Sequence, residues 1–430
     1  MQAQEDSRII GARLRTARSL WSMAKKATMP ADRFLSRFFF QNRKKIGSRD
    51  RKFLSETIYN AFRHKTFLEL WLREVLPRQN RVERDEDELF CILAAAKLGF
   101  VSKSLFEELG LGEGVYSSLR EHVLPPNFVS SSPEETLAAV YSFPLWLVTR
   151  WTGRYGVEPT ERLLKFFLSR PLLSIRVNPL KTSREKLIAL FQKSGIASEP
   201  AKRSPYGLLI PERNNVPEMP AFREGHFEVQ DEGSQLVCQK TEAKPGEFIW
   251  DVCAGGGGKS LLLAAMMENR GRIVATDIRA HKLDELKKRA KRAGAFNIFP
   301  TDLNRVNELA VTKKGFDKIL VDAPCSGTGT LARNPDAKWR MDESWLQKFP
   351  AEQTEIIEKA LPYLKKNGKL YYATCSLEPA ENERVVEKIL ETHPEMKCLP
   401  CGVSGESFFR LWPPESRTDG FFMAIMEKTQ

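Results

Sequence analysis

The chain of 430 residues is 42% hydrophobic and 28% charged, which are ordinary values for a globular protein and exclude wholesale disorder and fibrous repeats. At about 100–200 residues per domain, the length predicts two to four domains. The net charge is +12, of which +8 lies in residues 1–50, where 12 basic and 4 acidic side chains stand. This bias suits a polyanionic partner such as a nucleic acid, although many basic proteins bind none.

Sequence patterns also bear on the cellular compartment. The longest uncharged apolar stretch, residues 136–149, has 14 residues and contains Pro144, whereas a membrane-spanning helix needs about 18. Arg8, Arg13 and Arg15 interrupt the segment where a secretory signal would need an apolar core. The seven cysteines are irregularly spaced and do not fit a disulfide framework. We therefore predict a cytoplasmic protein with free thiols and no membrane partner.

The first third of the chain has a helical pattern. Apolar residues recur at spacings of three and four, with basic residues between them. We expect an all-helical domain over residues 1–150, whose basic first helix is either a solvated face or a face that contacts RNA. The predicted buried positions are Ile10, Leu14, Ala17, Trp21 and Ala24 in the first helix and Phe53, Leu54, Thr57, Ile58 and Ala61 in a second helix that Asp50 could cap.

The pattern changes twice after the helical part. LLSIRVNPL is strand-like, SREKLIALFQKSG is an amphipathic helix, and GLLIPE and HFEVQD are short apolar runs, which together predict a small α+β connector over residues 151–230. Over residues 231–430, apolar strands such as FIWDVCAG, RIVATDI, KILVDAPC and GKLYYATCS alternate with helices. This alternation predicts an α/β domain with a doubly wound, Rossmann-like parallel sheet, which FFRLWP and GFFMAIMEK could close as a hairpin.

The glycine run Gly255–Gly258 resembles a phosphate-binding loop but departs from both common patterns. A P-loop needs a glycine where Cys253 stands, and the dinucleotide fingerprint needs Gly or Ala where Ser260 stands. What remains is a strand that ends in Asp251, a turn that lets backbone approach a ligand, and the N-terminus of a helix.

Four aspartates end successive predicted strands, namely Asp251, Asp277, Asp302 and Asp322. Ligands of doubly wound sheets lie beyond the carboxyl ends of the strands, where an acid suits ribose hydroxyls. Carboxylates without a phosphate-binding glycine pattern favour a nucleoside without phosphates, and S-adenosylmethionine is such a ligand. The alternative is that these aspartates cap helices or turns, which is common for any single one.

Two cysteines stand just past two of the apolar strands. Cys325 lies in DAPCSGTGT and Cys375 lies in ATCS. A buried cysteine is usually an inert small hydrophobe, but Pro, Ser, Thr and Gly on strand-to-loop turns are poor core neighbours. One thiol at this edge is a candidate nucleophile, and two suggest a two-step covalent cycle.

These segments resemble a known family. DVCAGGGGKS, ATDIRAHKLDELKKRAKRAG, VDAPCSGTGTLARNPDAKWR and YYATCSLEPAENERVVEKIL are similar, in order and spacing, to the RNA cytosine-5 methyltransferases of the Sun/Fmu group, above all to the bacterial 16S ribosomal RNA enzymes. EVQDEGSQL and RTDGFFMAIMEK also match, and the helical part resembles the NusB-like RNA-binding domain of those enzymes. Gly255 and Gly256 replace the usual Ala-Pro, from which we expect a looser cofactor turn.

The resemblance implies a catalytic mechanism and a set of site residues. Cys375 would add to carbon 6 of cytosine, Cys325 would assist release of the methylated base, and Asp322 would hydrogen-bond the base. Lys259 would stand near the thiolate, because a neighbouring cation stabilises that form. The implied contacts to S-adenosylmethionine are Cys253, Ala254, Gly255, Gly256, Gly257, Gly258, Lys259, Asp277, Asp302 and Asp322. Arg333, Asp336 and Arg340 would either contact the RNA backbone or form a salt-bridged loop.

The sequence thus predicts a monomeric enzyme that methylates carbon 5 of a cytosine in 16S ribosomal RNA. Two alternatives are a transfer RNA cytosine-5 methyltransferase and a non-catalytic RNA-binding ribosome assembly factor, against which the intact pair Cys325 and Cys375 counts. His393, Glu395, Cys398 and Cys401 contain the letters of a zinc deaminase site, but only two residues separate Glu395 from Cys398, so we expect no metal.

Overall fold

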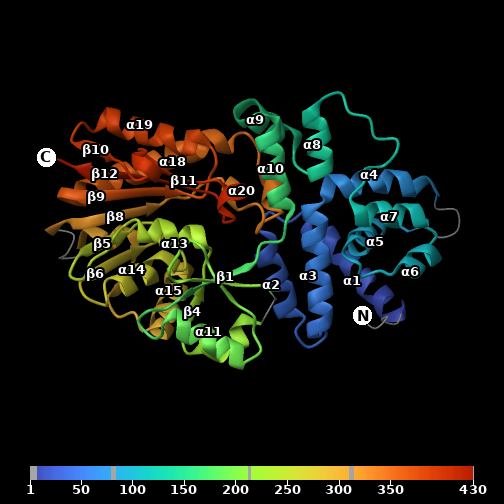
Figure 1. The fold of residues 1–430 in the computed structure, drawn as a ribbon, viewed down its shortest axis with the longest axis horizontal. Coiled ribbons are helices and arrows are strands. Elements are labelled where there is room, and N and C mark those ends of the chain that lie inside the picture. The colour runs from blue at the N-terminus through green and yellow to red at the C-terminus, as the bar shows by residue number, and fades with distance from the viewer. Residues whose placement is uncertain (1–6, 79–83, 212–214, 309–313, 430) are drawn as a thin grey trace. The chain divides into compact units, whose positions relative to one another are not determined.

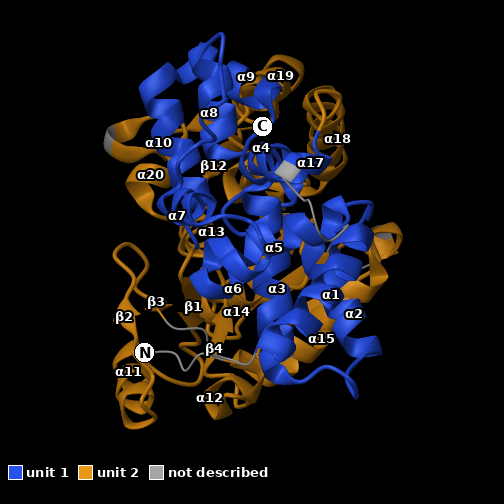
Figure 2. Ribbon diagram, turned by 90° about the vertical axis from the view of Figure 1, so that its right-hand side faces the viewer, with its two compact units in different colours: residues 1–170, 331–341 blue, residues 171–330, 342–430 orange. Residues whose placement is uncertain are grey.

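The computed structural model describes residues 7–78, 84–211, 215–308 and 314–429, and the chain forms two compact units (Figures 1 and 2). Unit 1 comprises residues 1–170 and 331–341, and unit 2 comprises residues 171–330 and 342–430. The helical unit therefore extends beyond the predicted boundary at 150 and includes a short segment from the predicted catalytic domain. The separation of a connector over residues 151–230 stays a prediction.

Unit 1 is helical, as the sequence predicts, and none of the helices in the described part of the chain is long and apolar enough to cross a membrane. Asp50 is the third residue of its helix rather than the cap, and its side chain accepts a hydrogen bond from the N–H of the capping residue, Gly47. The helices are α1 (Ser7–Ala24), α2 (Ala31–Gln41), α3 (Ser48–Arg63), α4 (Lys65–Val75), α5 (Glu86–Leu98), α6 (Lys103–Glu108), α7 (Glu113–Glu121), α8 (Pro133–Tyr141), α9 (Leu145–Tyr155), α10 (Val157–Leu168) and α17 (Ala337–Arg340), with the 3₁₀ turn η1 (Leu76–Arg78).

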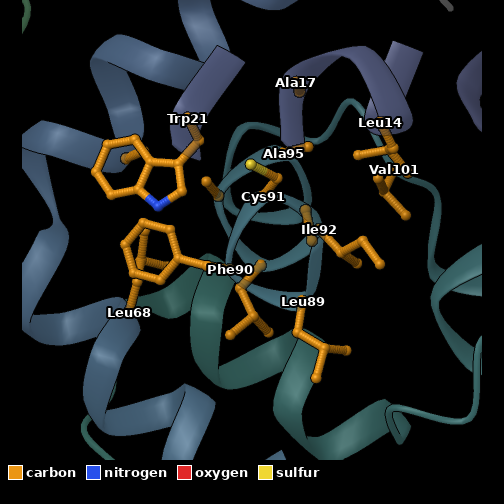
Figure 3. Close-up of a cluster of buried hydrophobic side chains, with 14 of the residues drawn as sticks. Leu14, Ala17, Trp21, Leu68, Leu89, Phe90, Cys91, Ile92, Ala95 and Val101 are labelled. Carbon is orange, nitrogen blue, oxygen red and sulfur yellow. The ribbon is translucent and has the colours of Figure 1, made fainter. Parts of the chain in front are cut away.

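Helix α5 forms the centre of the unit 1 core. All eight of its residues from position 89 to 96 are buried, so the helix is apolar on every side and other helices surround it. Trp21 of α1 stacks on Phe90 with ring centroids 4.8 Å apart (Figure 3). Every residue predicted to be buried in α1 and α3 is buried.

The segment 331–341 belongs to unit 1 because its polar groups are bound there. Buried Asp336 accepts a hydrogen bond from the first N–H of α2, at Ala31, and pairs with Arg340. Trp339 donates its indole N–H to the carbonyl of Phe62 at 2.6 Å. Of the two interpretations offered for this segment, the structure shows the salt-bridged loop for Asp336 and Arg340.

Lys338 is a buried cation in this segment. Its Nζ donates to the carbonyl of Arg63 at 3.0 Å and lies 3.9 Å from the ring centroid of Phe143. Burial, and then the charge of Arg63, lower the pKa of Lys338 well below its usual value. The unfolded chain therefore binds one more proton than the folded chain between the lowered pKa and about 10.4.

Stability should consequently rise with pH across that window, because folding must release the proton of Lys338 and this release costs less free energy as the pH rises. We expect Lys338→Met to flatten this rise by up to about 1.4 kcal/mol per pH unit. Denaturation midpoints of both proteins between pH 7 and 10 measure the difference. Parallel curves would show that Lys338 stays protonated throughout.

Unit 2 begins with a small antiparallel sheet in the order β2-β3-β1-β4. Its core includes Ile175, Leu187, Leu208 and Phe227, so the apolar runs noted in the sequence pack together. The elements are β1 (Leu173–Val177), α11 (Arg184–Lys193), β2 (Glu199–Pro200), β3 (Gly207–Ile210), η2 (Val216–Glu218), α12 (Pro220–Arg223) and β4 (Phe227–Val229).

The larger sheet of unit 2 has the order β10-β12-β9-β8-β5-β6-β7, with β11 paired to β12. Strands β7, β6, β5, β8 and β9 are parallel, and β12 is antiparallel to β9. The elements are α13 (Glu232–Gln239), β5 (Phe248–Asp251), α14 (Gly258–Met266), β6 (Arg272–Thr276), α15 (Ala280–Ala293), β7 (Ile298–Thr301), η3 (Leu303–Glu308), β8 (Phe316–Asp322), η4 (Thr328–Thr330), α18 (Trp345–Ala360), η5 (Leu361–Tyr363), β9 (Leu364–Thr374), η6 (Pro379–Glu381), α19 (Glu383–Thr392), β10 (Met396–Leu399), η7 (Val403–Gly405), β11 (Phe409–Leu411), α20 (Pro413–Ser416) and β12 (Phe421–Lys428).

Helices cover both faces of this sheet, which confirms the predicted doubly wound α/β fold. Leu320 and Tyr371 point to one face and pack with α13, α14 and α15, while their neighbours Val321 and Tyr372 pack with α18 and α19 on the other. The predicted terminal hairpin forms between β11 and β12, although β12 also inserts between β9 and β10.

Candidate active site

The candidate site lies at the carboxyl ends of the parallel strands. The order of the sheet reverses at β5, because β6 follows it on one side and β8 and β9 continue on the other. Such a switch point is where loops diverge and leave room for a ligand. The glycine turn after β5, the aspartates that end β6 and β8, and the loops that carry the two cysteines all start at this edge.

Asp277, just after β6, joins the glycine turn to the next helix. One carboxylate oxygen accepts from the N–H of Gly255 at 2.9 Å, and the other accepts from both the N–H and Nε of Arg279 at 2.9 Å. Burial opposes ionisation, but the hydrogen bonds and charge of Arg279 outweigh it and lower the pKa of Asp277. The Arg279 side chain is 48% exposed, so a ligand hydroxyl can take its place on the carboxylate.

The turn after β5 needs glycine at specific positions. Gly255 and Gly257 have φ angles of +54° and +82°. A Cβ on Gly257 would lie 2.6 Å from Leu286 of α15, so that side chain could not keep its place. The carbonyl of Gly256 accepts from Arg289 at 2.8 Å, which together with the Gly255–Asp277 bond holds the turn where Ala-Pro is usual.

Asp251 ends β5 and is fully buried. One oxygen accepts from the hydroxyl of Ser260 at 2.5 Å, whereas its Oδ1 is buried without a hydrogen-bond partner among the described residues. Burial raises the pKa of Asp251 to about 7. A buried acceptor with free capacity beside the glycine turn fits a ligand that brings a hydrogen-bond donor or a positive centre.

Asp322, at the end of β8, pairs with Lys259 from the first turn of α14. The Nζ–Oδ2 distance is 2.5 Å, and the lysine side chain is 9% exposed while the aspartate side chain is 30% exposed. Burial opposes the charge on Lys259, but Asp322, then Asp251 and Cys375, raise its pKa. Lys259 therefore stays a cation, and the remaining oxygen of Asp322 stays available to a ligand.

Cys325 and Cys375 meet at this edge. Their Sγ atoms are 3.3 Å apart, and both side chains are partly exposed. The hydrogen bond with Cys375, together with burial, raises the pKa of Cys325 well above its usual value. Cys325 thus keeps its proton and can donate it to the sulfur of Cys375. This arrangement places a thiol that keeps its proton beside a second sulfur.

The sequence analysis missed the buried polar groups that hold these two cysteines. Glu381, which is fully buried, accepts from the N–H of Ser326 and from the hydroxyl of Ser376, each at 2.8 Å. Gly329 donates its N–H to the carbonyl of Cys375 at 2.9 Å, and a Cβ there would lie 2.5 Å from the carbonyl of Gly420. The available signal was the Ser, Thr and Gly residues after Cys325 and the Thr and Ser on either side of Cys375.

Other predicted residues have simpler settings. Asp302 is exposed and accepts from the N–H of Asn304 at 2.9 Å, as a turn cap does. Burial raises the pKa of Cys253, and the N–H of Ala254 donates to Thr276. Among the described residues, the structure has no group of three His, Cys, Asp or Glu side chains arranged to hold a metal. The roles of all these residues toward a ligand stay predictions.

Comparison with known proteins gives the family. The family model "16S rRNA methyltransferase RsmB/F" matches residues 239–427, and a model of the ferredoxin-like domain of the same proteins matches residues 143–217. A Serratia proteamaculans ribosomal RNA small subunit methyltransferase B is 34% identical over 292 residues, which cover 67% of each chain. The chain belongs to the RsmB/F family of 16S rRNA methyltransferases.

A longer match supports the same assignment, and a solved structure shares the fold. A Bacillus subtilis protein, named "Probable ribosomal RNA small subunit methyltransferase B", is 28% identical over 412 residues, covering 89% of this chain and 92% of the relative. The solved structure of PH0851 covers all of both chains with a TM-score of 0.78 and 26% identity. The resemblance stated from the motifs is thus confirmed at the level of the RsmB/F family, and the ferredoxin-like match overlaps the predicted connector.

The position of Asp277 leads to a prediction about ligand affinity. Asp277→Ala should weaken binding of S-adenosylmethionine about 10-fold, because a charged acceptor for hydroxyls is worth roughly 1.5–3 kcal/mol. Arg279→Ala is the matched control: it removes the competing donor but leaves the carboxylate, so affinity should stay the same or increase. Isothermal titration calorimetry measures both. Equal affinity in wild type and Asp277→Ala would remove Asp277 from the site.

Proposed function

We propose that this chain methylates carbon 5 of a cytosine in 16S ribosomal RNA, with S-adenosylmethionine as methyl donor and Cys375 as covalent nucleophile. The observation that carries the proposal is the pair of thiols 3.3 Å apart at the carboxyl edge of the sheet. Carbon 5 of cytosine is a poor nucleophile, so the reaction needs a group that adds to the ring first. Membership of the RsmB/F family supports the RNA substrate.

The residues at the edge fit the proposed donor. Its adenosine carries hydroxyls and an amino group that seek acceptors, and its sulfonium is a cation. Asp277 is an acceptor beside the glycine turn, and so is the oxygen of Asp251 that has no hydrogen-bond partner within the described ranges. The turn itself lacks a phosphate-binding pattern. When bound, S-adenosylmethionine supplies an electrophilic methyl group.

The protein groups act on the base in two stages. The sulfur of Cys375 adds to carbon 6, and the ring electrons that move toward carbon 5 make that carbon nucleophilic. Asp322, held by Lys259, accepts a hydrogen bond from the exocyclic amine and orients the ring. Carbon 5 then takes the methyl group as the bond between that group and the sulfonium sulfur breaks. Afterwards the proton on carbon 5 leaves, the double bond re-forms, and the electrons of the broken Cys375–carbon 6 bond return to the sulfur.

Cys325 is the proposed acceptor of that proton. Its pKa is raised chiefly by the hydrogen bond with Cys375. Once the sulfur of Cys375 is bonded to carbon 6, this cause disappears, and the Cys325 thiol can release its own proton to solvent and then accept the proton from carbon 5. The two thiols therefore have different roles: Cys375 bonds to the cytosine ring, and Cys325 stays unbonded and acts as the base.

A direct test compares RNA substrates. The purified protein with radiolabelled S-adenosylmethionine should label 16S ribosomal RNA, free or in the small subunit, and nuclease digestion should release 5-methylcytidine. Label on transfer RNA alone would favour the transfer RNA alternative. Binding of 16S ribosomal RNA without any label would favour the assembly-factor alternative.

A further inference from the structure

We propose that a basic hollow on unit 2 binds backbone phosphates of the RNA substrate, an inference that rests on the function proposed above. The hollow has a volume of about 750 Å³, is open to solvent and contains one acidic side chain. The basic hollow is lined by Lys181, Arg223, Glu224, His226, Lys288, Lys291 and Arg292.

The cations come from two parts of unit 2. One group lies on α15, where Lys291 and Arg292 follow Lys288 by three and four positions. Residues at this spacing share one face of a helix. Lys181 follows β1, and Arg223 ends α12 in the small sheet module. Figure 1 shows α15 beside β4, the strand that follows Arg223. The hollow therefore lies at the joint where the small antiparallel sheet and its connections meet α15, a helix that packs on the larger sheet.

This joint is built rigidly. The buried side chain of Asn178 donates to the carbonyl of Gly225 and to the carbonyl of Ala293, each at 2.8 Å. A Cβ on Gly225 would lie 2.1 Å from the carbonyl of Arg292, so backbone meets backbone there. The cations on both sides are consequently fixed relative to one another, which lowers the cost of ordering them on a ligand.

The positive charge of the hollow is only partly neutralised. Buried Glu228 pairs with Arg292 and with Arg289, which anchors α15. Glu224 lies 3.5 Å from His226. Lys288 and Lys291 are exposed, and no carboxylate within the described ranges pairs with either. These two lysines are therefore the cations most available to an external anion.

The chemistry of the hollow fits a phosphate backbone. Its cations are spread over a wide, open surface, which suits a chain of phosphates rather than one enclosed anion. Helix α15, which forms one side of the hollow, also contacts the glycine turn, because Arg289 donates a hydrogen bond to the carbonyl of Gly256. RNA bound at the hollow would thus lie on the same rigid body as the candidate cofactor turn.

The test replaces Lys288 and Lys291 together with alanine and compares this variant with a matched control, Lys186→Ala plus Lys193→Ala. The control lysines are exposed on α11, outside the hollow, and removing them causes the same change in net charge. Binding of full-length proteins to a 16S ribosomal RNA fragment is measured between 50 and 300 mM KCl, with calorimetry of S-adenosylmethionine binding alongside.

We expect the Lys288/Lys291 variant to bind RNA about 10-fold more weakly at 100 mM salt and to lose roughly 1.4–1.8 from the salt slope, because two phosphate contacts are removed. The control should match wild type, and affinity for S-adenosylmethionine should not change. If RNA affinity depends on salt equally in the variant and the control, the proposal that the hollow binds phosphates is wrong, while the proposed function is unaffected. Failure of wild type to methylate RNA would overturn the function, but the slopes would still decide whether the hollow binds RNA.

A different observation carries a second proposal: we infer that Glu381 is a positioning residue that keeps the two cysteines in register. Its one carboxylate receives the backbone N–H that follows Cys325 and the hydroxyl that follows Cys375. Gln353 bridges further, donating to Glu381 at 3.2 Å and to the carbonyl of Pro324 at 2.9 Å. A shift of either loop would therefore cost a buried hydrogen bond.

Glu381→Gln keeps the shape but removes the charge and one acceptor. We expect kcat to fall about 10-fold or more with KM for both substrates unchanged. The pH profile of product release should also move to lower pH, because the Glu381 charge contributes to the raised pKa of Cys325. Unchanged kcat and profile would overturn the proposal. So would a loss of kcat that simply follows a loss of folded protein in melting curves.

Discussion

Replacing Cys375 with alanine is expected to lower methyl transfer at least about 10³-fold, because without the sulfur the ring carbon is not activated. The variant should still bind S-adenosylmethionine and RNA, since Cys375 stands apart from the Asp277 side of the edge. Incorporation of labelled methyl groups into 16S ribosomal RNA measures the rate. RNA that contains 5-fluorocytosine gives a second readout, because fluorine on carbon 5 cannot leave as a proton does and traps the covalent adduct.

Two matched variants sharpen this experiment. Cys398→Ala removes another partly buried thiol of unit 2 and should methylate and trap like wild type. Cys375→Ser keeps a hydroxyl of similar size and should be as inactive as alanine, because an un-ionised hydroxyl is a much weaker nucleophile. Trapping of the fluorinated RNA by Cys375→Ala would contradict the assignment and point to Cys325 as the nucleophile.

The fold could be predicted largely because its strands and helices have distinct hydrophobic periods. Ile319 and Val321 alternate with their neighbours across a sheet covered on both faces, so β8 reads as a continuous apolar run. β10 was missed, since only Met396 of its four residues is buried and an edge strand lacks that signal. The capping position of Asp50 was wrong by three residues, because Asp serves at either position.

The segment 331–341 shows where sequence order fails. It follows the Cys325 loop directly and was assigned to the catalytic domain, yet Asp336 and Trp339 bind backbone groups of helices far away in the sequence. Local propensity contains no information about such long-range partners. Lys338 is a second example. A lysine in a sequence is usually expected to be exposed, whereas the side chain of Lys338 is buried against Phe143.

The candidate site also contains residues that the sequence motifs identified and residues that they did not. The motifs placed Asp277, Asp322, Lys259 and the two cysteines at one edge, because parallel strands bring their carboxyl ends together. The sequence analysis did not name the partners of these groups. Arg279 donates hydrogen bonds to the carboxylate of Asp277, and Glu381 accepts hydrogen bonds from both cysteine loops. The contact of Arg279 with Asp277 is local, because two positions separate them in the sequence, whereas the contact of Glu381 with the Cys325 loop depends on tertiary packing.

The last expected result concerns Cys325. Cys325→Ala should leave attack by Cys375 intact but block release, because no base would then take the proton from carbon 5. An RNA–protein adduct should build up to about the amount of enzyme, survive denaturing electrophoresis and form on ordinary, unfluorinated RNA. Its formation should require S-adenosylmethionine, since before methyl transfer the addition of sulfur to carbon 6 reverses freely.

The double variant Cys325→Ala plus Cys375→Ala is the decisive control, because it should form no adduct at all. The pH dependence adds a further check. In wild type, release needs the ionised Cys325, so turnover should rise with pH until that thiol has lost its proton in the covalent complex. Rapid turnover by Cys325→Ala without an adduct would assign Cys325 a packing role beside Cys375 and move the base to another group, such as Asp322 at the end of the preceding strand.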